Sequence, residues 1–291
     1  MSKPKRHHFV PQLLQKRFVN NDGKLWAFDR RRASGAPYAT YPNDALLEGQ
    51  LYTVKEADGS QNAELESWFS RLESEAAPIV DKMVASVRAN RLPRLNLSER
   101  ITWDRFFLQQ WRRVPDLFES LLPSEQFAKD VMELLDEFDT VVRPVSADER
   151  QRLLQKSELK RMRGNVFATT LLEESEEALD LLGSRGLAFL RVKNPRKSMI
   201  LASRPVVRWG FKDNPHLSDP RTEMWLPISA DVAVGVGRYD VPEFFRELTD
   251  SDTRFLNEGL ARQSSQIVGR SFELINSLGR FVGDDQVSNR Y

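Results

Sequence analysis

Residues 62–87 read NAELESWFSRLESEAAPIVDKMVASV. The apolar side chains of this stretch recur every three to four residues, which places them on one side of an α-helix. These positions are Leu65, Trp68, Phe69, Leu72, Ile79, Val80, Met83, Val84 and Val87. The stretch therefore predicts one long amphipathic helix, or two shorter ones, with an apolar face turned toward a core.

The same periodicity continues beyond this stretch. A helix is expected from about Leu97, ended or kinked at Val114-Pro115 because proline lacks the N–H that a helix interior needs. An acidic amphipathic helix is expected over Ser124–Phe138, and further helices up to Gly183. Residues 60–183 therefore form a predicted helical block.

Strand patterns flank this block on both sides. Lys24–Asp29 reads as a strand before it, and the apolar period changes to two after it. Leu187–Val192 and Ser198–Ala202 read as a hairpin around Asn194-Pro195, and residues 206–209, 224–228 and 232–236 read as further strands. Residues 241–248 and 254–281 are predicted to be helical. We expect a single α+β domain over residues 1–291, with the central helical block packed on a small, mostly antiparallel sheet formed by strands from both chain ends.

Composition limits the function. The net charge of +1 over 291 residues gives no general attraction to nucleic acids or anionic membranes. The absence of cysteine excludes disulfides, thiolate nucleophiles and cysteine-ligated metals. No apolar run reaches the roughly 18 residues that a membrane helix needs, and no signal-peptide apolar region follows the basic start. We therefore expect a soluble cytoplasmic protein with no membrane partner.

Two of the three histidines, His7 and His8, lie side by side in KPKRHHFVPQLLQKRF, residues 3–18. The apolar residues after them have helical spacing, and Pro11 suits a first helical turn, so both histidines precede a helix N-terminus that favours an anion. We expect one histidine to act as general acid or base. The alternative is a solvated basic tail. In an extended segment the two side chains would point to opposite sides and would not share one task.

Metal and cofactor sites are not expected. No pair of histidines has the spacing that presents two imidazoles to one zinc ion. No glycine-rich phosphate loop is present, and the aromatic residues of the helical block have core spacing. The third histidine, His216, is expected to face solvent from a loop.

Gln110 and Arg113 share one helix face and could hold a phosphate or carboxylate by charge-assisted hydrogen bonds. The alternative is a surface ion pair of Arg113 with Asp116 or Glu119. Ser203 follows a predicted strand at a sharp turn, where functional residues often lie. It lacks the G-x-S-x-G surroundings of a nucleophile, so the alternative is a turn serine.

The opening His7-His8-Phe9-Val10-Pro11-Gln12, continued by Leu14 and Phe18, resembles the start of a bacterial family, domain of unknown function 4238. Three further segments are also similar to that family: Gln110-x-x-Arg113-x-Pro115, residues 202–206 and residues 257–270. The last of these is expected to be a helix. Relatives carry Asp where Ser203 stands, which puts activity here in doubt if that Asp is functional. The resemblance implies candidate positions, Gln12 among them, but no reaction.

Two functions follow as hypotheses. The first is a metal-independent phosphodiesterase or nuclease-like enzyme acting on a nucleic acid or nucleotide, in the setting of phage defence or a toxin. His7 and His8 would be catalytic there, and Gln12, Gln110, Arg113 and Ser203 would bind substrate. The second is a non-catalytic interaction or regulatory module. Its histidines would be structural, and the acidic helix over Glu133–Asp139 would face an unidentified protein partner.

Overall fold

The computed structural model describes residues 6–49, 51–55, 61–62, 64–209, 217–237 and 243–284. The helices are α1 (Gln12–Gln15), α2 (Glu64–Arg88), α3 (Leu97–Arg112), α4 (Pro115–Leu121), α5 (Ser124–Val141), α6 (Ala147–Leu153), α7 (Lys156–Leu172), α8 (Glu176–Gly183), α9 (Asp250–Arg262) and α10 (Phe272–Gly279). The strands are β1 (Arg6–His8), β2 (Leu25–Asp29), β3 (Tyr38–Thr40), β4 (Leu47–Gly49), β5 (Val54–Lys55), β6 (Gln61–Asn62), β7 (Leu187–Val192), β8 (Leu201–Ala202), β9 (Val207–Trp209), β10 (Glu223–Pro227), β11 (Val232–Val236), β12 (Phe244–Leu248) and β13 (Gln266–Gly269).

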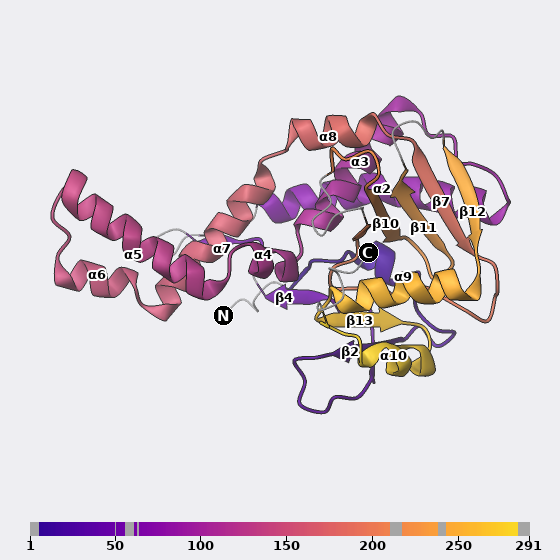
Figure 1. Ribbon diagram of the computed structural model, residues 1–291, viewed down its shortest axis with the longest axis horizontal. Helices are drawn as coiled ribbons and strands as arrows, with labels where there is room; N and C mark the ends of the chain where they lie inside the picture. The colour runs from indigo at the N-terminus through magenta and orange to yellow at the C-terminus, as the bar shows by residue number, and fades with distance from the viewer. Residues whose placement is uncertain are drawn as a thin grey trace.

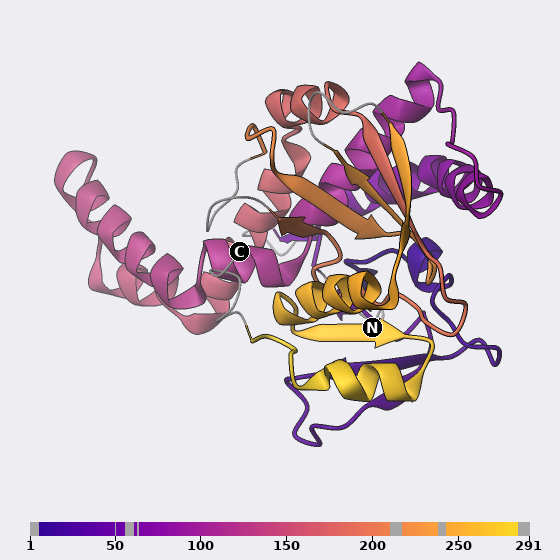
Figure 2. The same cartoon turned by 45° about the vertical axis from the view of Figure 1, so that its right-hand side comes forward.

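Strands from both chain ends meet in one sheet, as the sequence predicts. This four-stranded antiparallel sheet has the order β3-β2-β13-β8, with Trp26 opposite Gly269. A second sheet, β12-β7-β11-β10-β9, comes entirely from the C-terminal part of the chain and contains one parallel pair, β12 with β7. The fold is α+β, but with two larger sheets in place of the single sheet expected. Helix α9 contacts both sheets, and α10 covers β2 and β13 (Figures 1 and 2).

Helix α2 is one continuous helix that includes Pro78. It packs against α3, which begins with a capping box: the Asn96 side chain accepts from the N–H of Glu99, and the Glu99 carboxylate accepts from the N–H of Asn96. Helix α3 ends at Arg112 and α4 begins at Pro115, so the break predicted at Val114-Pro115 is confirmed. The buried apolar side chains of α2, α3 and both sheets form one connected core.

Helices α5 and α6 and the first half of α7 extend away from this core as an arm (Figure 1). The chain runs out along α5 and returns along α6 and α7, and most side chains of α5 are exposed. Phe127 is the buried residue of α5, whereas Phe167, Ala168 and Leu171 of α7 belong to the base of the arm. The arm therefore has little core of its own.

Three local predictions are wrong. Strands β7 and β8 do not form a hairpin, because the chain leaves the five-stranded sheet after β7 and enters the four-stranded sheet at β8. Residues 244–248 form β12 and residues 266–269 form β13, where helices were expected. Strands β12 and β13 are short and adjoin helices in the chain, so the apolar period of the sequence did not separate them from those helices. Within the described residues, no helix is long and apolar enough to cross a membrane.

Candidate functional site

The two histidines lie on β1, which pairs with β4 in antiparallel register, His7 opposite Glu48 and His8 opposite Leu47. Successive side chains of a strand point to opposite faces. His7 is accordingly buried, whereas His8 is half-buried. Helix α1, which follows, has only four residues, so its end provides a much weaker anion site than the sequence suggested.

His7 has protein groups against both ring nitrogens. The backbone N–H of Tyr52 donates to Nδ1 over 3.0 Å, and the Tyr52 ring stacks on the imidazole at 5.6 Å between centroids. Because a backbone N–H can only donate, Nδ1 is unprotonated and the neutral ring carries its proton on Nε2. Nε2 lies 3.2 Å from a carboxylate oxygen of Glu66. A catalytic histidine needs one nitrogen open to substrate, and the side chain of His7 is fully buried.

His8 points to the other side of β1. Its Nε2 lies 3.1 Å from the carbonyl oxygen of Pro42. Burial lowers the pKa of His8 below its ordinary value of 6.5, partly offset by the carbonyls of Pro42 and Asn43. The neutral form of His8 is therefore favoured in the folded protein.

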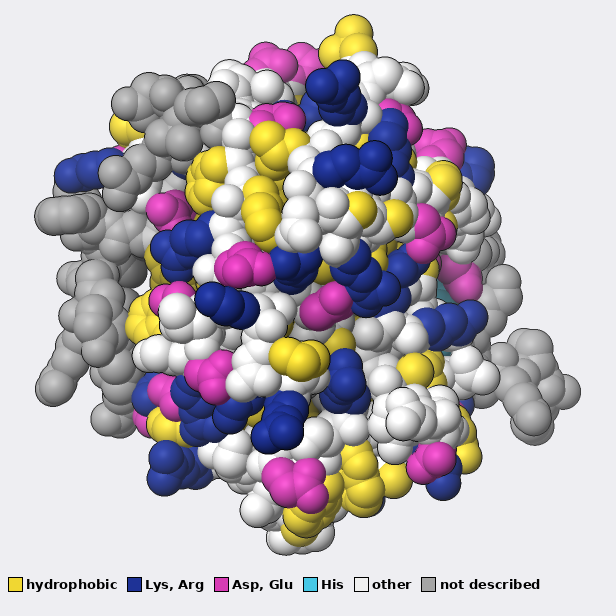
Figure 3. Space-filling view, turned by 90° about the vertical axis from the view of Figure 1, so that its right-hand side faces the viewer, with side chains coloured by type: hydrophobic (Ala, Val, Ile, Leu, Met, Phe, Trp, Pro, Cys, Tyr) yellow, Lys and Arg dark blue, Asp and Glu magenta, His cyan; other side chains and the backbone are white. Residues whose placement is uncertain are grey.

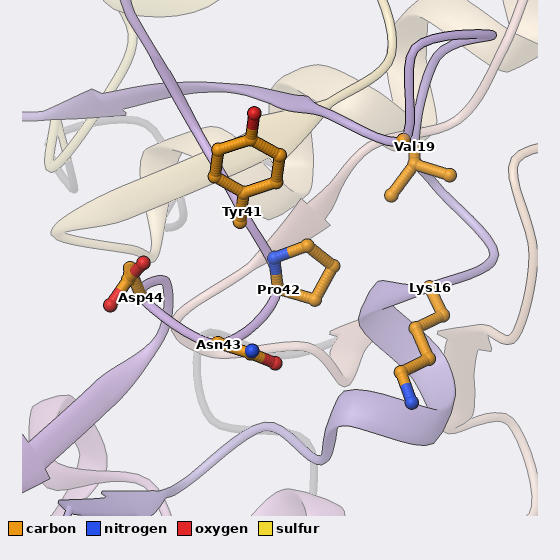
Figure 4. A pocket seen from close by; sticks show the side chains of 7 residues that line it. Lys16, Val19, Tyr41, Pro42, Asn43 and Asp44 are labelled. Carbon is orange, nitrogen blue, oxygen red and sulfur yellow. The ribbon is translucent and has the colours of Figure 1, made fainter.

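An open depression of about 390 Å³ lies beyond Pro42. Figure 4 shows Tyr41, Pro42, Asn43 and Asp44, which come from one loop, beside Lys16 at the C-terminus of α1. Among the described residues that line it there is neither His7 nor His8. The depression therefore does not give either histidine direct access to a bound substrate.

Arg113 is also buried, with 1 % of its surface exposed. Its Nε donates to the carbonyl of Phe9 over 3.0 Å, and its Nη1 donates to Glu73 over 2.8 Å. Its Nη2 donates to the Oε1 of Gln110 over 3.4 Å. The guanidinium also lies over the Phe69 ring, 4.8 Å from the centroid. Arg113 thus joins the N-terminal segment to the helical block, and its carboxylate partner is Glu73, not the Asp116 or Glu119 considered from the sequence.

Tyr52 and Gln110 complete this junction. The Tyr52 hydroxyl donates to the carbonyl of Arg113 over 3.0 Å, and burial raises the pKa of that hydroxyl, so it stays protonated as a donor. Gln110 is fully buried and its Nε2 donates to the carbonyl of Phe106 over 3.4 Å. We call the set His7, Tyr52, Glu66, Glu73, Gln110 and Arg113 the histidine–arginine junction.

Ser203 belongs to a second cluster on the other side of the same helix break. Its hydroxyl donates to the carboxylate of Asp116, at the start of α4. That carboxylate also accepts from the N–H and the hydroxyl of Ser265, each over 2.9 Å. A carboxylate therefore does lie at the turn where Ser203 stands, and α4 supplies it.

The segment 110–116 thus contacts both other candidate segments, the N-terminal one through Arg113 and the Ser203 turn through Asp116. Gln12, the first residue of α1, is half-buried and has no side-chain hydrogen bond within the described part of the chain. Its neighbour Gln15, not singled out from the sequence, is buried and donates to the carbonyls of Val10 and Ala45 over 2.7 and 3.1 Å.

Sequence reasoning also missed Tyr52, Glu66 and Glu73. Glu66 and Glu73 are one helical heptad apart on α2, so both reach the junction from the same side. In the described ranges, no group of three His, Asp or Glu side chains could hold a metal ion. His216 lies outside the described residues.

Comparison with known families gives one match. The model of DUF4238, described as a protein of unknown function, matches residues 6–271, which include the histidine–arginine junction and the Ser203 turn. No curated protein and no solved structure matches the chain. Because the match covers most of the chain, this protein belongs to the DUF4238 family of proteins of unknown function.

Proposed function

We propose that this protein is a non-catalytic interaction protein that binds a basic, amphipathic helical segment of a partner along α5 of its arm. The observation that carries this proposal is an apolar stripe on α5 that is largely exposed, although the Arg143 guanidinium lies over the Phe138 ring, 5.3 Å from its centroid. Leu134, Phe138 and Val141 are 63 %, 38 % and 73 % exposed. They are spaced i, i+4 and i+7, so they form one row along the helix.

Exposed apolar side chains in a row differ from scattered ones. Single exposed apolar residues are common, whereas a contiguous apolar row on a helix is the surface that helix-in-groove recognition uses. The row continues the face on which Phe127 is buried at the base of the arm. Helix α5 lies in the arm, away from the core (Figure 1), and the exposed side chains of the row are open to a partner.

Charge identifies the partner chemistry. Helix α5 contains six acidic residues, Glu125, Asp130, Glu133, Asp136, Glu137 and Asp139, and one basic residue, Lys129, which gives a net charge of −5 (1 − 6). Glu133 and Glu137 make no ion pair within the described chain, and by helical geometry they border the apolar row. A basic partner complements this border. A second copy that packed its own α5 here would bring like charges together.

The junction favours this function over catalysis. His7 and Arg113 are buried and bonded to protein groups, which is how structural side chains are held. The phosphodiesterase hypothesis stays a prediction that a hydrolysis assay can test.

Binding of a synthetic peptide tests the proposal. The probe places Leu and Lys at helical spacing, and a scrambled peptide of the same composition is the control for simple charge attraction. In fluorescence anisotropy we expect the helical peptide to bind and the scrambled peptide not to bind. The double variant Leu134→Asp/Phe138→Asp should weaken binding of the helical peptide roughly tenfold or more. The matched control is Met132→Asp, an exposed apolar residue on the opposite side of α5, which should bind as the wild type does.

Two results would overturn the proposal. One is equal binding of the two peptides, which would mean that charge alone is recognised. The other is a dimer in analytical ultracentrifugation that the Leu134→Asp/Phe138→Asp variant abolishes, which would make a second copy the occupant.

A further inference from the structure

A separate cavity of about 300 Å³ lies at the other end of the molecule from the arm. Three segments form it: the connection between β7 and β8, helix α9, and the start of α10, all at the right-hand end of Figure 1. Figure 3 shows that end face-on, with Lys and Arg side chains across its middle and Asp and Glu among them. The lining side chains that matter here are Arg196, Lys197, Ser198, Asp250, Arg254 and Glu273.

Most charges of this cavity already have partners. Asn194 donates to both carboxylate oxygens of Asp250 over 3.1 Å, and Ser271 donates to Glu273 over 2.7 Å. Arg254 donates to Glu258 over 2.6 Å. Arg196 and Lys197 are exposed and make no ion pair with any described residue. The uncommitted charge at the rim is therefore positive.

The floor of the cavity contains a serine hydroxyl. Ser198 is 7 % exposed and lines the cavity, and its hydroxyl has no hydrogen-bond partner among the described residues. Its position is fixed, because the buried Asn257 donates to the Ser198 carbonyl over 2.9 Å and accepts from the N–H of Ile200 over 3.0 Å. Because Ser198 lines the cavity and its hydroxyl makes no hydrogen bond to a described residue, this hydroxyl is available to a bound ligand.

We propose that this cavity binds the phosphoryl group of a small phosphate monoester, with Arg196 and Lys197 at the rim and the Ser198 hydroxyl at the floor. A phosphoryl dianion offers several acceptor oxygens to the guanidinium, ammonium and hydroxyl donors at once. The cavity exceeds the size of a phosphate ion, which leaves room for the organic part of the ligand. The first turn of α10 adds N–H groups at the same side.

Calorimetric titration with AMP, inorganic phosphate and adenosine tests this site on the full chain. We expect AMP and phosphate to bind and adenosine to show no binding. We expect the Arg196→Ala/Lys197→Ala variant to bind AMP roughly tenfold more weakly or worse, and Ser198→Ala to weaken it as well.

The matched control removes the same charge from the same end of the molecule. Arg91 and Lys193 are exposed and make no ion pair with described residues, and neither lines the cavity. Arg91→Ala/Lys193→Ala should bind AMP as the wild type does. An equal loss in this control would overturn the site in favour of diffuse attraction, and so would no binding of AMP and phosphate or equal binding of adenosine. None of these results depends on the peptide proposed for α5.

Discussion

The backbone N–H of Tyr52 donates to Nδ1 of His7 over 3.0 Å, across 45 residues of sequence. Because Nδ1 accepts this bond, the imidazole is neutral, and its Nε2 lies 3.2 Å from a carboxylate oxygen of Glu66. The imidazole therefore holds the segment that contains Tyr52 against β1.

Removing the His7 ring should destabilise the protein. His7→Ala leaves the Tyr52 N–H without an acceptor and opens a cavity beside the Tyr52 ring, for an expected loss of about 2–4 kcal/mol in the free energy of unfolding. His7→Asn should recover about 1 kcal/mol of this, because its Oδ1 can accept the same N–H. Urea denaturation measures both. His8→Ala is the control, since His8 is half-buried and should lose less. A His7→Ala variant as stable as the wild type would contradict the structural role.

Removing the Arg113 charge should be costly as well. Arg113→Met leaves Glu73 without its cation and the Phe9 carbonyl without its donor, for an expected loss of about 3 kcal/mol. Adding Glu73→Gln should cost about 1 kcal/mol less than the sum of the two single changes, because the two residues interact directly. The exposed Arg94, which has no ion pair with described residues, gives the control Arg94→Ala, expected within about 0.5 kcal/mol of the wild type. Strict additivity in the double-mutant cycle would show that the pair does not interact.

Stability should fall as the pH falls below about 6.5, and His8 should contribute to this fall. Burial lowers the pKa of His8 in the folded state, whereas the unfolded chain keeps the ordinary value of 6.5. The unfolded state therefore binds more protons in this range, and the contribution of neutral His8, present above pH 6.5, is lost toward the lowered folded pKa. The wild-type advantage over His8→Gln in unfolding free energy should shrink between pH 7.5 and pH 5. An advantage that grows on acidification would mean that the folded protein prefers protonated His8.

The helices of the core could be predicted from sequence because their apolar period is long and regular. Helix α2 and the end of α3 at Val114-Pro115 are of this kind. Strands β12 and β13 could not, since four or five residues beside a helix carry no distinct period, and their identity comes from pairing with β7 and β2.

The site was predictable only in part. The His7-His8 pair and the Gln110–Arg113 face are visible as motifs, and Arg113 does reach the N-terminal segment. Their partners are not visible, because Tyr52, Glu66 and Glu73 lie tens of residues away from them and nothing in their own neighbourhood marks them. Unless those partners are known, the local sequence motif cannot distinguish a buried structural histidine from an exposed catalytic one.

If the histidine–arginine junction is structural and the protein acts by binding, the purified protein should not hydrolyse phosphodiester or phosphate-ester bonds. The assay uses RNA, DNA and nucleotides, each with and without a chelator. The same assay is run on His7→Asn after denaturation has shown that this variant is folded. We predict no hydrolysis of any of these substrates by wild type or variant. Hydrolysis by the wild type that the folded His7→Asn variant loses would contradict the claim and make His7 catalytic.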